Sequence, residues 1–148
     1  MAALAPSRPR DILLVEDDAA DAMLIEEALL QRGAARTITV VQDGIAALEH
    51  LRDPALQRPD VIVLDLNMPR MNGRELLAVL KADPELKVVP VVVLSTSNSP
   101  EDVSGAYRRH ANAYITKPVN LDEFINAVQS IDAFFLDTVT GIPRDGEL

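Results

Sequence analysis

Polar side chains follow several short apolar runs of this chain, and together they could do chemistry. Glu16 and Asp17 come directly after one such run, Asp65 ends a Val-Ile-Val-Leu run, and Lys117 lies just beyond another. Adjacent like charges at the end of a buried strand raise each other's pKa unless a cation compensates them. Three carboxylates that converge with one ammonium group suggest a hard divalent cation. We expect Mg²⁺, which is typically held by one or two carboxylates and keeps water and phosphate oxygens as further ligands.

Other metals fit the sequence less well. Calcium is disfavoured because the loop spacing D-x-[DN]-x-[DN]-G is absent. Zinc is disfavoured because the chain has no cysteine, and because its two histidines, His50 and His110, lie far apart in predicted helices.

The elements that must position these groups alternate regularly. Runs rich in Val and Ile indicate strands, several of them buried on both faces, at residues 12–15, 38–41, 61–66, 88–94 and 113–115. Stretches with helical spacing lie between and after them, at 19–31, 44–51, 73–82 and from residues 100 and 121 onward. Five strand–helix repeats predict a doubly wound α/β domain, in which a five-stranded parallel sheet carries helices on both faces. Ligands bind such sheets beyond the carboxyl ends of the strands, where the polar groups above should meet.

Helix starts are marked by residues that can cap a helix. These residues are Asp18, Asp43, Ser99 and Asn120. Ser99 and Asn120 each have an acidic residue three positions later, which predicts a reciprocal capping box at both. Gly33 is expected to end the first helix.

Composition narrows the class of protein. The chain has 148 residues, 48% of them hydrophobic, and carries 14 basic against 23 acidic side chains for a net charge of -9. Such a surface repels phosphate backbones and anionic lipid, so nucleic-acid and membrane binding are disfavoured. No apolar run approaches the roughly 20 residues of a membrane helix, and the N-terminus lacks the pattern of a signal peptide. We expect a single small cytoplasmic domain.

Five motifs in order give the chain a family resemblance. The run from Ile12 to Asp18 resembles the acidic-pair segment of two-component response-regulator receiver domains, and Val63 to Pro69 with Gly73 resembles their phosphoacceptor loop. Ser95 lies 30 residues beyond Asp65 and Lys117 lies 52 beyond it, as the family's switch hydroxyl and lysine do. Tyr114 falls at the aromatic switch position.

The resemblance implies a flavodoxin-like fold with strand order 2-1-3-4-5 and a role for each site residue. Asp65 would accept a phosphoryl group from a sensor histidine kinase, and Lys117 and Ser95 would contact its oxygens. Tyr114 would swing inward as Ser95 moves. Mg²⁺ would be held by Asp17, Asp65 and the main-chain carbonyl of Asn67, with Glu16 binding metal-bound water. A cis bond between Lys117 and Pro118 is also implied.

The sequence departs from commoner family patterns in three places. Glu16 stands where an Asp is usual, and Ser95 stands where a Thr is more frequent. Thr96 occupies a position where many receivers have Ala or Gly, which predicts narrower access to the phosphate.

A finer resemblance concerns stand-alone receivers that partner bacterial phytochrome kinases. It rests on residues 15–21, 42–48 and 113–119 and on the extension that begins Phe134-Phe-Leu. It implies a tail at 1–10, a receiver domain at 11–136 and a C-terminal extension at 137–148. A chemotaxis-type or phosphorelay receiver served by another kinase stays open as an alternative.

The last helix is more apolar than its own domain requires. Helical spacing predicts that it covers the sheet with Leu121, Phe124, Ile125, Val128, Ile131 and Phe135. The apolar pattern continues past them, and we expect a homodimer contact from Phe134, Phe135, Leu136, Val139 and Ile142. The alternative is a terminal helix that folds back on its own domain.

Two other classes of function compete with a phosphorylation-switched interaction protein. A phosphatase with an aspartyl-phosphate intermediate would need a second acid two residues after the nucleophile, where Asn67 stands, and an insertion to build a substrate pocket. A pseudo-receiver that only dimerises would not need its site residues intact. The sequence therefore favours a receiver that catalyses only its own phosphoryl transfer and dephosphorylation, and is not otherwise an enzyme.

Overall fold

The computed structural model describes residues 9–141, in which strands and helices alternate. The strands are β1 (Arg10–Val15), β2 (Arg36–Val41), β3 (Val61–Leu64), β4 (Val91–Ser95) and β5 (Ala113–Thr116). The helices are α1 (Ala19–Gln31), α2 (Gly44–Leu51), α3 (Gly73–Ala82), α4 (Pro100–Arg108), α5 (Leu121–Asp132) and the π-helix η1 (Ala133–Thr138).

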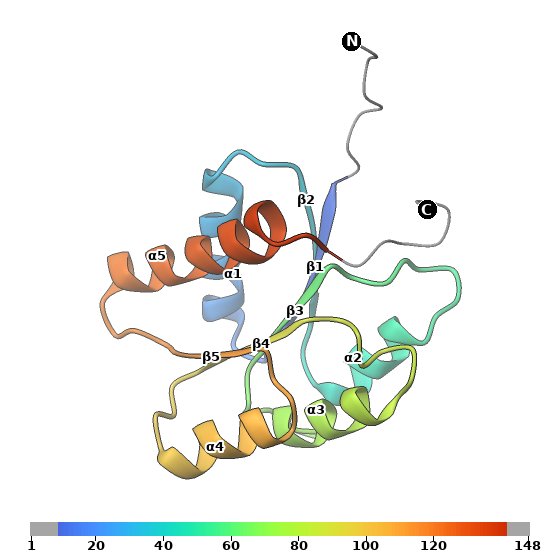
Figure 1. The fold of residues 1–148 in the computed structure, drawn as a ribbon. Helices are drawn as coiled ribbons and strands as arrows, with labels where there is room; N and C mark the ends of the chain where they lie inside the picture. The colour runs from blue at the N-terminus through green and yellow to red at the C-terminus, as the bar shows by residue number, and fades with distance from the viewer. Residues whose placement is uncertain (1–8, 142–148) are drawn as a thin grey trace, which may run out of the picture.

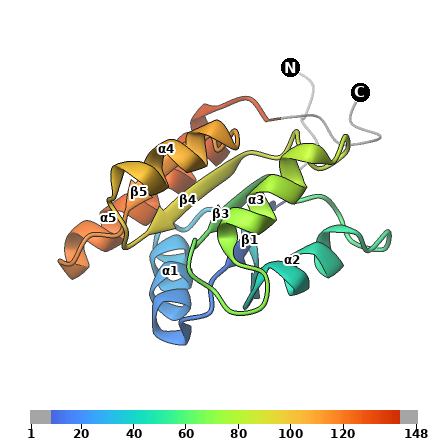
Figure 2. The ribbon, with the colours of Figure 1, turned by 90° about the horizontal axis from the view of Figure 1, so that it is seen from below.

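The strands form one parallel sheet in the order β2-β1-β3-β4-β5, as the family resemblance implies. Helices α1 and α5 pack together on one face, and α2, α3 and α4 cover the other (Figures 1 and 2). The predicted doubly wound α/β architecture is confirmed. Strands β1 and β3 are neighbours near the middle of the sheet, and their last residues, Val15 and Leu64, are in register.

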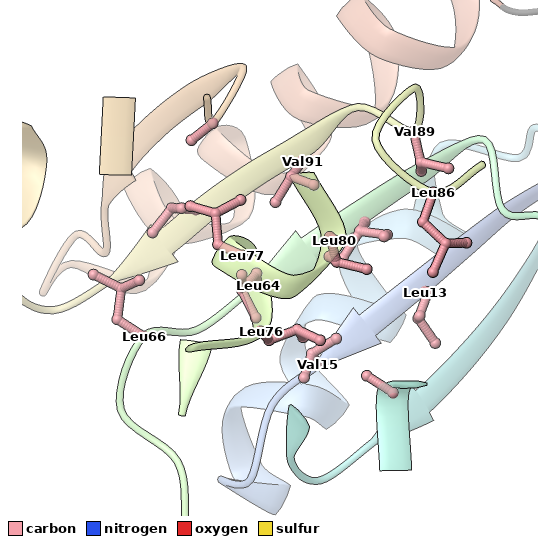
Figure 3. Close-up of a cluster of buried hydrophobic side chains, with 14 of the residues drawn as sticks. Leu13, Val15, Leu64, Leu66, Leu76, Leu77, Leu80, Leu86, Val89 and Val91 are labelled. Atoms are coloured by element: carbon pink, nitrogen blue, oxygen red, sulfur yellow. The ribbon is translucent and has the colours of Figure 1, made fainter. Parts of the chain in front are cut away.

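Two apolar cores sandwich the sheet, because successive strand residues point to opposite faces. Leu13 and Val15 of β1 pack toward α2, α3 and α4 with the leucines of α3 (Figure 3). Ile12 and Leu14 pack toward α1 and α5. The nearly continuous apolar runs in the sequence reflect this burial on both faces.

Some strand limits differ from those predicted. Strand β4 begins at Val91 because Pro90 has no N–H to donate; its carbonyl accepts a bond from the amide of Ile62. Strand β3 ends at Leu64, although Leu66 beyond it is still buried. The implied cis bond before Pro118 is wrong, because the described residues contain no cis peptide bond; the trans form is favoured even before proline.

The predicted helix caps are all present. The side chains of Asp18, Asp43, Ser99 and Asn120 each accept a hydrogen bond from the amide three residues on. Gly33 follows the end of α1 with a φ of 74°.

The capping boxes are placed differently. A complete box forms at Asn72 and Glu75, at the start of α3, where no cap was predicted. At Ser99 the return bond is missing, because the amide of Ser99 donates to the hydroxyl of Ser97 and the carboxylate of Asp102 binds elsewhere.

The C-terminal helix changes its period after Asp132. The wider turn of η1 makes residues five apart face the same way, so Leu136 follows Ile131 into the core and is only 5% exposed. Leu136 therefore packs inside its own domain. Phe134 remains 54% exposed, beside a half-buried Phe135. Val139 is also exposed, and Ile142 lies outside the described residues.

Ion pairs fasten this segment to the end of α1 and the start of β2. The buried carboxylate of Asp132 binds Arg32 and Arg36. Asp137 binds the same two guanidinium groups, each at 2.8 Å. Through Thr138 the chain folds back on its own domain, so η1 crosses the predicted limit at residue 136. No helix among the described residues is both long enough and apolar enough to span a membrane.

Candidate functional site

The two central strands carry the acidic residues of the candidate site. Glu16 follows β1 and Asp65 follows β3. The amide of Asp65 donates to the carbonyl of Val15 at 3.0 Å, and the amide of Glu16 donates to Val41 of β2 at 2.9 Å. The sheet pairing thus extends one residue past β1 and β3, and it fixes the two backbones side by side at the rim predicted from the topology.

Glu16, Asp17 and Asp65 form a compact carboxylate cluster. One oxygen from each lies within 4.8 Å of the others. Glu16 is 2% exposed and Asp65 is 9% exposed, while Asp17 faces solvent. Three oxygen donors at this spacing, one of them open to water, fit a hard divalent cation that keeps part of its hydration shell.

Burial dominates the electrostatics of Glu16. It raises the pKa of this carboxyl to about 7, against the opposing effect of a hydrogen bond from Lys117, and the charge of Asp65 raises it further. Without a bound cation, ionisation of all three carboxyls is therefore unfavourable, as expected for like charges at the end of a buried strand.

Lys117 reaches the cluster from the outer strand β5. Its amide donates to the carbonyl of Ser95 at 2.7 Å, and its ammonium lies 2.5 Å from Glu16 and 2.8 Å from Asp21. Burial lowers the pKa of Lys117, but the hydrogen bonds to Asp21 and Glu16 outweigh it and the net shift is upward. The lysine is therefore a buried, charged group. Its contact with Asp21 was not predicted.

A hollow lies over the cluster. Its lining, beyond the five charged residues named above, consists of Asp18, Ala19, Ala20, Asn67 and Thr96. Asn67 follows Asp65 by two residues, at the edge of the hollow. Thr96 lines the same hollow, and its expected effect on access to the phosphate stays a prediction. Asp18 lines the same hollow while it caps α1.

The hydroxyl predicted to switch belongs to Ser95, the residue before Thr96. Ser95 ends β4, is fully buried, and accepts a hydrogen bond from the amide of Ser97 at 3.2 Å. The carbonyl of Ser97 accepts a bond from the hydroxyl of Tyr114 at 2.7 Å. Tyr114 is half-buried against the core under α2–α4. Ser97 thus links the two predicted switch residues.

Ser97 is also tied to the neighbouring helices. Its hydroxyl donates to Asp102 of α4 at 2.6 Å, and Asp102 pairs with Arg74 of α3 at 2.7 Å. These two bonds hold the pKa of Asp102 below its usual range. The sequence shows both charges but gives no sign that they meet.

The loop that carries Asp65 and Asn67 is closed tightly. The amide of Gly73 donates to Leu66 at 3.0 Å, and a Cβ at Gly73 would lie 2.2 Å from the carbonyl oxygen of Asp65. Only glycine fits there, which gives the glycine of the phosphoacceptor motif a steric reason.

A family comparison covers most of the chain. Residues 12–129 match the model of the response regulator receiver domain. Response regulator Rcp1 of Synechocystis sp. is 43% identical over 136 residues, which are 89% of this chain and 92% of Rcp1.

Solved structures show the same fold. The crystal structure of Mn²⁺-bound Rcp1 has a TM-score of 0.87 and 42% identity, covering 91% of this chain and all of that one. The phosphorylated cyanobacterial phytochrome response regulator RcpA has a TM-score of 0.88 and 44% identity, covering 92% of this chain and all of RcpA.

Proposed function

This chain belongs to the response regulator receiver family, whose mechanism is phosphorylation on an aspartate, and on that premise we propose that Asp65 is its phosphoacceptor. The observation that carries the proposal is the position of Asp65. It is a nearly buried carboxylate that follows a central strand, clusters with Glu16 and Asp17, and lines an open hollow. Members of this family are signalling proteins, so the proposed reactions of this chain are its own phosphorylation and dephosphorylation.

The phosphoryl donor is a phosphohistidine of a sensor histidine kinase. A carboxylate oxygen of Asp65 attacks the phosphorus in line, the new O–P bond forms, and the P–N bond breaks with its electron pair passing to the imidazole nitrogen. The product is an acyl phosphate on Asp65. Such a transfer is governed by positioning and by neutralisation of charge, which the surrounding residues supply.

The carboxylate cluster would hold Mg²⁺ through Asp17, Asp65 and the main-chain carbonyl of Asn67, with Glu16 holding metal-bound water. The oxygen donor set fits this ion, and Mn²⁺ binds the similar protein Rcp1. When bound, the cation supplies positive charge against the oxygens of the phosphoryl group.

Lys117 and Ser95 would contact the transferred group. The ammonium of Lys117 pairs with Glu16 and Asp21 and lines the same hollow, where it would contact a phosphate oxygen as a compact point charge. The hydroxyl of Ser95 would donate a hydrogen bond to a phosphate oxygen. Because Ser97 bonds both Ser95 and Tyr114, movement of Ser95 reaches Tyr114 and changes the surface formed by α4, β5 and α5.

We assign the kinase to the bacterial phytochrome class, because RcpA, 44% identical, is described as a phytochrome response regulator. Signalling then proceeds by phosphorylation-dependent protein–protein contact. The net charge of -9 disfavours direct binding to nucleic acid or to anionic membranes.

We also propose that the chain forms a homodimer through its C-terminal region. Phe134 and Val139 are the exposed apolar side chains of that region among the described residues, and the half-buried Phe135 packs edge-on against Phe134 with ring centroids 5.2 Å apart. Leu136 supports the contact from within the domain.

Intact-mass analysis tests the proposed phosphoacceptor. The wild type and Asp65→Asn are incubated with acetyl phosphate and Mg²⁺. We expect one added phosphoryl group in the wild type and none in the variant. Undiminished labelling of Asp65→Asn would place the acceptor elsewhere, and no labelling of either protein by acetyl phosphate or by a bacteriophytochrome kinase would contradict the proposed function.

A further inference from the structure

The loop between β3 and α3 contains a backbone conformation that its residue type disfavours. Arg70 has a φ of 60°, in the left-handed region that residues with a Cβ rarely adopt. Such a conformation persists where the surroundings determine it, and it is more common at functional sites. Arg70 lies five residues after Asp65 and three after Asn67, within the proposed phosphoacceptor loop.

An ion pair explains how Arg70 is held. Its Nε lies 2.6 Å and its Nη2 3.0 Å from the two carboxylate oxygens of Asp43, a paired geometry that a planar guanidinium provides. Asp43 is nearly buried and also caps α2 by accepting a bond from the amide of Ala46 at 2.9 Å. The carboxylate is therefore fixed by the helix cap, and the ion pair fastens the loop to it.

A second contact fastens the loop to the same place. The amide of Gly44, the residue after Asp43, donates to the carbonyl of Met71 at 2.8 Å. A Cβ at Gly44 would lie 2.6 Å from the Met71 side chain, so the two segments are as close as a glycine allows. Arg70 and Met71 are thus bound to consecutive residues at the start of α2.

We propose that the Asp43–Arg70 ion pair is a positioning device for the metal site: it holds the β3–α3 loop, and with it Asn67, whose main-chain carbonyl would be a metal ligand. The inference rests on the proposed function, because it concerns the ligand that Asn67 supplies. It adds a residue pair outside the site that sets the affinity for the metal.

The direction in which the metal affinity changes distinguishes a positioning role of Arg70 from a simple effect of its charge. Loss of the Arg70 cation near an acidic cluster should strengthen binding of a divalent metal if only charge matters, because a like charge has been removed. Loss of the loop anchor should weaken binding. We therefore expect Arg70→Ala to lower the affinity for Mn²⁺, by about tenfold, the scale seen when a residue that orients a metal ligand is removed.

The experiment measures Mn²⁺ binding by calorimetry and, in the metal-free protein, amide hydrogen exchange at Gly44. The variants are Arg70→Ala, Arg70→Gly and Arg70→Lys, with Arg52→Ala as a control that removes an exposed arginine at the end of α2. We expect faster exchange and weaker binding in Arg70→Ala and Arg70→Gly, a smaller loss in Arg70→Lys because one ammonium cannot form the paired contact, and wild-type behaviour in Arg52→Ala.

Arg70→Gly tests whether the backbone strain or the guanidinium of Arg70 controls the affinity for Mn²⁺, since glycine adopts the same φ without strain. Recovery of wild-type binding in Arg70→Gly would overturn the proposal, as would unchanged or tighter binding in Arg70→Ala. Unchanged exchange at Gly44 would also overturn it, and this readout needs no metal. Failure of the wild type to bind Mn²⁺ would instead contradict the proposed metal site, and the exchange data would still decide whether the pair holds the loop.

Discussion

The hydroxyl of Tyr114 donates a 2.7 Å hydrogen bond to the carbonyl of Ser97, whose own amide donates to Ser95. A single loop residue therefore joins the last residue of β4 to the aromatic side chain on β5. Coupling between two sites needs a structural element that both can bias, and we propose Ser97 for that role.

Tyrosine emission should report the state of this link. The chain has no tryptophan and two tyrosines, and the second, Tyr107, accepts a bond from the amide of Tyr114 at 3.2 Å. We expect acetyl phosphate with Mg²⁺ to change the emission of the wild type and to leave that of Asp65→Asn unchanged. Tyr114→Phe should lose most of the change. A change of full size in Tyr114→Phe would assign the signal to Tyr107 and refute the switch role of Tyr114.

Lys117→Ala should uncouple phosphorylation from the change in tyrosine emission. The variant loses the ammonium that neutralises charge in the hollow, so we expect labelling by acetyl phosphate to slow by about a hundredfold, the scale of one lost electrostatic donor. The tyrosine emission of the labelled fraction should stay unchanged. Intact mass and emission are followed together, with the exposed Lys87→Ala as control. Normal coupling in Lys117→Ala would contradict the assigned contact.

Leu136→Ala and Phe134→Ala should have opposite profiles. Leu136 is buried in its own core, so its truncation should lower the free energy of unfolding by about 2–5 kcal/mol. Phe134 is exposed, so its truncation should change the free energy of unfolding of the monomer by less than about 0.5 kcal/mol and weaken self-association. Urea unfolding at low concentration and sedimentation equilibrium measure the two effects. A wild type that stays monomeric well above micromolar concentration would rule out the dimer.

The stability lost in Asp43→Asn should depend on pH. The hydrogen bonds from Arg70 and from the amide of Ala46 hold the pKa of Asp43 below its usual value of 3.8. A carboxyl whose pKa is lowered by folding stabilises the protein above its unfolded pKa, and this contribution is lost as the pH falls through the folded pKa. Asparagine keeps the helix cap but not the charge. Urea unfolding should show a clear difference in the free energy of unfolding between the variant and the wild type at neutral pH, and this difference should shrink below about pH 4. An equal difference at neutral and at acidic pH would mean that the ion pair does not stabilise the fold.

Much of the fold follows from short-range chemistry that a sequence displays. Asp18 and Asp43 mark helix starts because capping needs only a side-chain oxygen and an amide three residues away. The strand order came from the family resemblance and was confirmed. The limit at Pro90 was missed because the apolar run continues through it, although the ring removes a ladder bond.

What the sequence could not supply are contacts between distant segments. Asp21 lies within the predicted helix at 19–31, yet its carboxylate also binds Lys117, 96 residues away. Arg70 and Asp43 pair across 27 residues, and the positive φ that makes this possible carries no signal in an arginine. The period change at η1 is equally hidden, because Leu136 continues an apolar pattern that either face could use.

The packing of α1 against α5 sets an order for folding during synthesis. The core under α2, α3 and α4 takes its side chains from Leu13 to Ala111, so it can close while the last helix is still being made. The core on the other face needs Phe124, Val128 and Leu136 to cover α1. A nascent chain therefore carries a first helix whose apolar side is covered only by the sheet, and not yet by α5, until nearly all of the protein has left the ribosome. In that interval the exposed apolar surface is prone to aggregation.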